Sequence, residues 1–311
     1  MKQTRETYKT IASNAIATLV LSGQLLATDS NEPGELRDLV LMPGQPKSNP
    51  PLIRQVDPQD GNPLFPLPDL PSSRLPPPGK MKLTVRLGRQ IGTERGGYLY
   101  SATVDSAKST SALKHIGLPP LVVKVSPVGM AGVLLPEAQS YLDLERFQGI
   151  TIPHFYGLFT ATVPNDSQFL PWQRRREERE GDNDPSDHPL ARELPSNVVS
   201  VLVMERVGGP VPLDDGLLKN PRTVAELKSL YKDLASLGYL HFDMTYFNIA
   251  MAPSHPPLHR RVSPAWNRPY RFRLVNFHRA KRAAMEREKT YTEQANHLQY
   301  LINQIYAGCV L

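Results

Sequence analysis

Proline restricts where this chain can build regular structure. The sequence has 31 prolines in 311 residues, concentrated in the first eighty residues and in later loops. Proline lacks an amide donor and resists helix interiors and inner strand positions. The tract 43–79 is therefore expected to be extended and mostly disordered, either as a linker or as a ligand for a proline-reading module. Residues 1–80 are interpreted as a leader outside the folded domain.

The extreme N-terminus is apolar from Ile11 to Ala27, after several basic residues. Such a pattern faintly resembles a signal or transit peptide. Glu6 interrupts the basic region, however, and polar residues such as Ser13 and Gln24 interrupt the apolar one. We therefore expect a short amphipathic helix here.

Composition narrows the class of protein. The hydrophobic fraction of 40% is enough for a folded core, and the net charge of +6 is mildly basic. No basic-aromatic module accompanies that charge, so we expect no nucleic-acid partner. A single cysteine, Cys309, cannot form an internal disulfide, which favours an intracellular protein, cytoplasmic or nuclear. No apolar run is long enough for a membrane span.

At Met81 the pattern changes to that of a folded α+β domain, which we expect to extend to residue 308. Alternating or continuous apolar runs predict strands, and apolar spacing of three and four predicts helices. The first half reads as strands at 81–88, 97–104, 121–126, 155–163 and 198–206, with one helix at 136–146 and a charged loop at 173–195. The second half reads as helices at 223–237 and 292–306, with short strands at 249–251 and 272–277.

The segment Tyr239–Ala250, YLHFDMTYFNIA, carries the most chemistry. It follows a predicted helix and precedes a short strand, so its polar residues lie on a loop. A carboxylate there, Asp243, can accept a proton from an attacking hydroxyl, and the amide oxygen of Asn248 can bind a metal ion on nucleotide phosphates. A plain alternative is a loop in which both side chains make turn hydrogen bonds.

This segment resembles the His-x-Asp-x-x-x-x-Asn catalytic loop of protein kinases. The resemblance implies that Asp243 is the catalytic base, that Asn248 is a metal ligand, and that His241 packs beneath the loop. It covers residues 81–308, and the short, diverged fungal protein-kinase-domain proteins are a close comparison. The expected fold is a two-lobe kinase-like one, with a small lobe at 81–208 and a large lobe at 209–308.

Upstream segments occupy the order that this family requires. Lys124 lies in the apolar strand LVVKV, where its ammonium needs a partner. The resemblance makes Lys124 the residue that holds the α- and β-phosphates of ATP, and Glu137 its ion-pair partner. A surface lysine and a helix-initiating acid are the alternative.

The segment IGTERGGYLYSATV stands at the place of the glycine-rich loop, with Gly92 and Gly97 on the outer glycine positions. Glu94 replaces the middle glycine and would weaken the hold on phosphates. The stretch VLVMERVGG matches the strand that leads to the hinge. By resemblance, Glu205 and Val207 would present backbone groups to adenine.

Several positions depart from the family pattern. In RLVNFHRA, Asn276 replaces the metal-binding aspartate and His278 replaces the following glycine, so binding of Mg²⁺ is expected to be weak. Phe242 stands at the position of the catalytic-loop arginine. Thr245 stands at the position of the lysine that usually lies two residues after the catalytic aspartate. No Ala-Pro-Glu segment follows, which predicts a truncated helical lobe without the helices that hold peptide substrates.

Three functions remain open from the sequence. The first is ATP-dependent phosphotransfer to a protein hydroxyl, or to a small molecule, with weak or lost activity. The second is an inactive pseudokinase that binds or scaffolds an unidentified protein partner. The third is an unrelated interaction protein in which the landmarks coincide by chance. The kinase interpretation requires Lys124, Glu137, Asp243, Asn248 and Asn276 to line one cleft.

Overall fold

The computed structural model describes most of the chain as two compact units of mixed α and β structure. Unit 1 comprises residues 1–47, 74–138 and 155–206, and unit 2 comprises residues 48–73, 139–154 and 207–311. The described residues are 11–28, 34–46, 52–54, 65–94, 97–108, 118–171, 194–212, 216–253 and 261–307. Cys309 and residues 173–193 of the expected charged loop lie outside these ranges.

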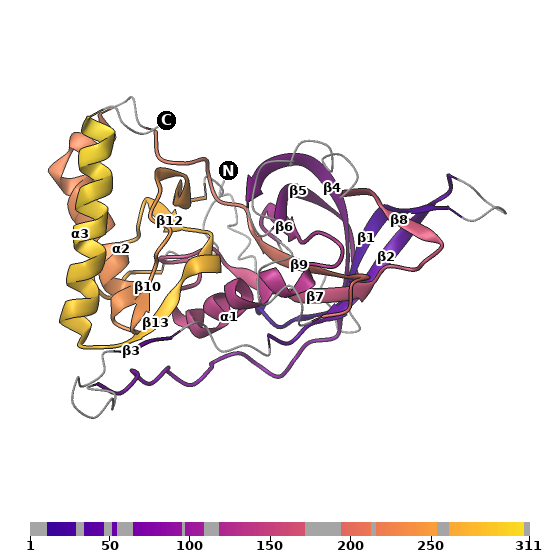
Figure 1. Cartoon of the computed structure of the whole chain (residues 1–311), viewed down its shortest axis with the longest axis horizontal. Coiled ribbons are helices and arrows are strands. Elements are labelled where there is room, and N and C mark those ends of the chain that lie inside the picture. The colour runs from indigo at the N-terminus through magenta and orange to yellow at the C-terminus, as the bar shows by residue number, and fades with distance from the viewer. Residues whose placement is uncertain are drawn as a thin grey trace, which may run out of the picture. The chain divides into compact units, whose positions relative to one another are not determined.

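Five antiparallel strands of unit 1 follow the sequence expectation. They pair in the order β4-β5-β6-β9-β7 (Figure 1). Every residue of β6 and β9 is buried, as their continuous apolar runs indicate. The strands are β4 (Met81–Glu94), β5 (Gly97–Lys108), β6 (Leu121–Val125), β7 (Phe155–Thr162) and β9 (Val198–Glu205).

The N-terminal segment is a strand, so the predicted amphipathic helix is wrong. Strand β1 (Ile16–Ala27) runs parallel to β4 and antiparallel to β2 (Leu36–Pro43). Leu19 and Leu21 are two residues apart and have no exposed surface, so they share one face of the strand, and Val20 between them is buried as well. Gly23, with φ of +63°, lies where the register between β1 and β2 shifts, and this irregularity conceals the alternation in the sequence.

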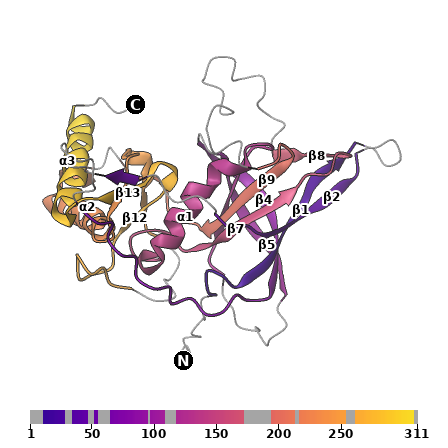
Figure 2. The same ribbon diagram turned by 60° about the horizontal axis from the view of Figure 1, so that its bottom comes forward.

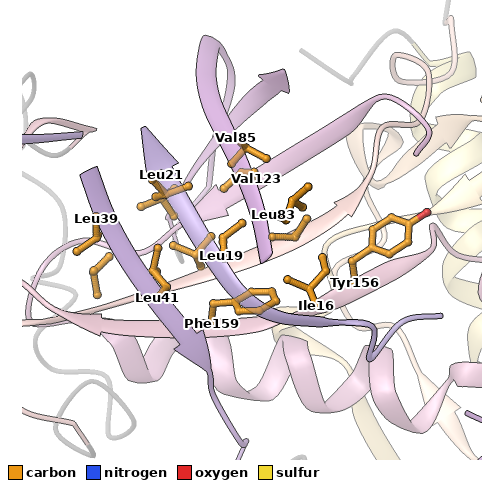
Figure 3. Close-up of a cluster of buried hydrophobic side chains, with 14 of the residues drawn as sticks. Ile16, Leu19, Leu21, Leu39, Leu41, Leu83, Val85, Val123, Tyr156 and Phe159 are labelled. Carbon is orange, nitrogen blue, oxygen red and sulfur yellow. The ribbon is translucent and has the colours of Figure 1, made fainter. Parts of the chain in front are cut away.

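The hairpin of β1 and β2 closes the sheet of unit 1. Figure 2 shows β1 and β2 side by side. Strand β2 also pairs with β7, so seven strands form a ring, and each has two neighbours within it. Strand β8 (Ser167–Phe169) is added at the end of β1. The ring encloses one apolar cluster, to which β1 contributes Leu19 and Leu21 and β2 contributes Leu39 and Leu41 (Figure 3).

The described part of the expected leader is ordered, and the boundary at residue 81 is therefore wrong. In unit 1, the Gly79 amide donates to the Asn14 carbonyl at 2.9 Å. In unit 2, β3 (Leu52–Arg54) pairs in parallel with β13 (Lys281–Ala284). The carbonyl of Pro68 accepts a hydrogen bond from Arg282. The proline tract thus contributes backbone hydrogen bonds to both units.

Helix α1 (Leu135–Asp143) begins in unit 1 and ends in unit 2. Unit 2 contains the other two α-helices of the described chain, α2 (Pro221–Ala235) and α3 (Arg287–Tyr306). All three helices confirm the sequence expectation to within a few residues at each end.

Local chemistry fixes the ends and the packing of helix α2. Its first turn is capped by Asn220, whose side chain accepts from the Arg222 amide, and Pro221 occupies the first helical position. The α2 and α3 helices are joined through Gln294 of α3, whose amide donates to the carbonyls of Tyr231 and Tyr239.

Short strands complete unit 2. Strand β11 (Ile249–Met251) pairs with β12 (Phe272–Leu274), and β10 (Tyr239–Leu240) pairs with β13. The strand expected at 272–277 ends at Leu274, because Asn276 has a left-handed backbone. Within the described ranges, no helix has both the length and the apolar character that a bilayer span requires.

The closed ring predicts that β1 is part of the folding unit. Leu19→Ala removes a side chain with no exposed surface, and we expect it to lower the free energy of unfolding by roughly 2–5 kcal/mol. Leu36→Ala on β2 is the matched control, because Leu36 is 58% exposed, and its effect should stay within about 0.5 kcal/mol. Urea unfolding of both variants checks this, and equal stabilities would mean that β1 is not packed in the core.

Candidate functional site

A buried ion pair lies in unit 1. Lys124 Nζ, from the middle of β6, contacts Glu137 Oε2, from the first turn of α1, at 2.6 Å, and each side chain is 1% exposed. Burying two charges is costly unless they are paired at close range. The contact that the sequence predicted between these residues is confirmed. The role of the lysine in holding phosphates stays a prediction.

The glycine-containing hairpin is formed by β4 and β5. Gly97 is required by packing, because a Cβ there would lie 2.4 Å from the Val125 carbonyl oxygen of β6. At Gly92 a Cβ would meet only the Leu99 side chain, at an ordinary 3.7 Å. The glycine at position 97 therefore has a structural cause, and binding of phosphates by either residue stays a prediction.

The expected hinge segment follows β9. Glu205 ends that strand and is buried, and the Arg206 amide donates to the Pro120 carbonyl at 2.8 Å. Val207 begins the next part of unit 2. Adenine binding by the backbone of Glu205 and Val207 stays a prediction.

A polar cluster in unit 2 brings together three residues that are far apart in the sequence. The antiparallel pairing of β11 and β12 sets Ile249 opposite Leu274. The Val275 amide continues this ladder by donating to the Asn248 carbonyl at 3.0 Å. Asn248, which ends a 3-10 turn, and Asn276, which follows β12, are thereby placed side by side.

The side chains of this cluster hydrogen-bond to one another. Asn248 Nδ2 donates to the Asp243 carbonyl oxygen at 2.7 Å and to Asp243 Oδ2 at 3.0 Å. Asn276 Nδ2 donates to the same Asp243 Oδ2 at 3.3 Å and to Asn248 Oδ1 at 3.2 Å. His278 Nδ1 lies 2.7 Å from Asn276 Oδ1. The structure thus groups Asp243, Asn248 and Asn276, and adds His278.

His241 contacts the segments on either side of Asn276, through Val275 and Phe277. The ring Nε2 lies 2.9 Å from the Val275 carbonyl oxygen, to which it donates, and the ring packs edge-on to Phe277 at 4.8 Å. Burial lowers the pKa of His241, which keeps the ring neutral. The supporting role expected for this histidine agrees with these contacts.

Phe242 stands where the catalytic loop of protein kinases has arginine, and its ring contacts neighbouring side chains. Lys281 Nζ lies 5.2 Å from the ring centroid, a cation–π distance, and the His297 ring lies edge-on at 6.5 Å. Phe242 therefore links the loop to β13 and α3 through side-chain contacts.

Sequence reasoning missed a second buried centre, at Asp233 of α2. Its carboxylate accepts hydrogen bonds from the side chains of Thr151 at 3.1 Å, Ser263 at 2.7 Å and Tyr270 at 3.0 Å. Burial raises the pKa of Asp233, while these hydrogen bonds lower it. The contacts fix the segment that leads into β12 and hence to Asn276. The sequence signal that could have revealed this centre is the position of Asp233, an acidic residue on the apolar side of a predicted helix.

The polar cluster offers a poor donor set for Mg²⁺, which binds oxygen atoms in octahedral geometry. Both amide nitrogens, from Asn248 and Asn276, point at Asp243 Oδ2. The amide oxygens face Asn276 Nδ2 and the His278 ring. Among the residues that the structure describes, no group of three His, Cys, Asp or Glu side chains forms a metal site. The residues do not fit the ion that the kinase resemblance implies.

Comparison with known proteins gives only a distant likeness. No protein-family model and no curated protein matches the sequence. Among solved structures, the chain is similar to one described as vaccinia related kinase 3, with 14% sequence identity and a TM-score of 0.32. The match covers 64% of this chain and 48% of the other, so it spans about half the length of that protein.

The buried ion pair generates a stability prediction. Lys124→Met leaves the Glu137 carboxylate buried without this cation, so we expect a loss of roughly 3–5 kcal/mol in the free energy of unfolding. Replacing both residues, as in Lys124→Met with Glu137→Leu, should recover most of that loss. Denaturant unfolding provides the measurement.

Arg86 provides the matched control. It pairs with Asp105 at 3.0 Å but is 68% exposed, so Arg86→Met should cost less than about 1 kcal/mol. Equal losses for Lys124→Met and Arg86→Met would contradict the burial of the first pair.

Proposed function

We propose that this chain is a protein-kinase-like domain that binds an adenine nucleotide and a protein partner, with phosphoryl transfer weak or lost. The observation that carries the proposal is the cluster of Asp243, Asn248 and Asn276. Three positions that match the family's catalytic and metal-binding motifs meet in space, across more than thirty residues of sequence. Turn hydrogen bonds within one loop explain the contact of Asp243 with Asn248, but they do not explain why Asn276 joins them.

The Lys124–Glu137 pair supports nucleotide binding. A lysine held at 2.6 Å by a buried carboxylate has a fixed side chain, so little conformational entropy would be lost when it binds a phosphate oxygen. Its ammonium has three donors and can serve more than one acceptor. Lys124 would then hold the phosphates of ATP.

The polar cluster supports weak or absent transfer. Asp243 would be the base, yet its Oδ2 already accepts two hydrogen bonds, from Asn248 and Asn276. Efficient phosphoryl transfer depends on cations that neutralise charge on the transferring group. A neutral amide at Asn276 does not replace the carboxylate that would bind such a cation, so turnover should be slow or lost.

Residual transfer is the second candidate, because Asp243 and Asn248 are both present in the family's spacing. The described chain contains only α2 and α3 as complete helices of unit 2. Few helical surfaces are then available to hold a peptide, so a small molecule is the better acceptor under this candidate.

Nucleotide binding and transfer are tested separately. ATP should raise the thermal midpoint of the wild-type chain, since a ligand at a hundred times its Kd stabilises by about 2.7 kcal/mol. In Lys124→Met, the thermal midpoint with ATP should equal the midpoint of the same variant without ATP. In Arg86→Met, ATP should raise the midpoint as it does in the wild-type chain. Absence of a shift with ATP, ADP or adenosine in the wild-type chain would rule out nucleotide binding.

Transfer is measured with radiolabelled ATP, both with a generic protein acceptor and with a set of small hydroxyl compounds as acceptors. Label incorporation by the wild-type chain should equal that by Asp243→Ala. Incorporation far above the Asp243→Ala level would instead establish an active kinase.

A further inference from the structure

We infer that the side-chain amide of Asn276, held in one orientation by His278, occupies the position of a divalent cation and makes the site metal-independent. The inference deepens the proposed function and rests on it for identifying the site. The argument itself uses only contacts within unit 2.

The orientation of the Asn276 amide follows from its neighbours. With Nδ2 toward the cluster, it donates to Asp243 Oδ2 at 3.3 Å and to Asn248 Oδ1 at 3.2 Å. Exchanging the oxygen and nitrogen would place an oxygen against both acceptors at the same distances. Both acceptors are oxygens, and one belongs to a carboxylate, so the exchanged orientation would set oxygen against oxygen and is repulsive.

His278 reinforces this orientation from the other side. Its Nδ1 lies 2.7 Å from Asn276 Oδ1, so the ring donates from Nδ1 to the amide oxygen. A glycine at position 278, as in the family pattern, could not make this contact. The departures from the family pattern at positions 276 and 278 therefore belong together, because His278 fixes the Asn276 amide with its nitrogen toward Asp243.

The amides perform the electrostatic task of a cation. Asp243 Oδ2 accepts from Asn248 Nδ2 and Asn276 Nδ2, and the two asparagines are 5% and 7% exposed. Asp243 is only partly buried, and a carboxylate oxygen packed against buried groups needs donors or a cation to replace lost hydration. With both donors present, a divalent ion would have to displace two hydrogen bonds and accept nitrogen-bearing groups as neighbours. Binding the ion therefore brings little gain.

The backbone at position 276 allows a sharp test. Asn276 has φ of +66°, and the only other non-glycine residue with positive φ in the described chain is Asn267, at +53°. Asn276→Asp would set a second carboxylate against Asp243 and so create a cation site. Asn267→Asp adds the same charge in a similar backbone conformation on an exposed loop, and it is the matched control.

The experiment measures metal binding without nucleotide. Wild-type protein should show the same thermal midpoint in EDTA, Mg²⁺ and Mn²⁺, and it should leave the electron paramagnetic resonance signal of free Mn²⁺ unchanged. Asn276→Asp should have a lower midpoint than wild type in EDTA, regain stability with Mn²⁺, and reduce the free Mn²⁺ signal. Asn267→Asp should behave as wild type in all three conditions.

The role of His278 is tested by His278→Gly in the wild-type background. Releasing the amide should permit weak Mn²⁺ binding, detectable as a small loss of the free signal. An unchanged signal in this variant would limit the orienting role to Asp243 alone and overturn the part assigned to His278.

Two outcomes would overturn the main inference. One is Mn²⁺ binding by the wild-type chain that Asn276→Leu abolishes. The other is a folded Asn276→Asp variant that binds no Mn²⁺ and matches the wild-type midpoint in EDTA. Neither depends on ATP. Failure of nucleotide binding would refute the proposed function and leave the metal result intact.

Discussion

The fold of unit 1 depends on how its sheet edges are satisfied. Without β1 and β2, the five strands β4, β5, β6, β9 and β7 would leave unpaired backbone groups on β4 and β7. Exposed sheet edges of this kind invite pairing with other chains. The β1–β2 hairpin pairs with both edges and closes the ring. Closure also supplies a second wall of leucines to the core. Lys124 lies in β6, between β5 and β9, and its ion pair with Glu137 makes its burial tolerable.

In unit 2, the position of the segment around β12 depends on two buried acidic residues of helix α2. Helix α2 carries Asp233 and Glu226 two turns apart, and both are almost fully buried. Asp233 binds the hydroxyls of Ser263 and Tyr270, while Glu226 accepts from the backbone and side chain of Arg271. The short strands β11 and β12 have few ladder bonds of their own. These side-chain anchors therefore fix the position from which Asn276 enters the cluster.

The sequence predicted the elements whose apolar pattern is regular. Strands β4 to β7 and β9, and all three helices, follow continuous or periodic apolar runs. The charge of Lys124 in an apolar strand indicated that it needs a partner, and the kinase resemblance implied that this partner is Glu137. β1 was mistaken for a helix because the bulge near Gly23 breaks its alternation. The leader was read from its prolines, yet extended proline segments can contribute carbonyl acceptors, as Pro68 does toward Arg282.

The polar cluster shows why site chemistry was harder to predict than site position. Motif spacing singled out Asp243, Asn248 and Asn276, which the structure groups, but it could not reveal which way each amide points. That direction depends on His278, a residue that seemed only to be a lost glycine. An asparagine alone would be a weakened metal ligand, because its oxygen could still rotate toward an ion. An asparagine whose oxygen is already engaged presents only donors to Asp243, so the cluster is an arrangement of neutral groups around one carboxylate.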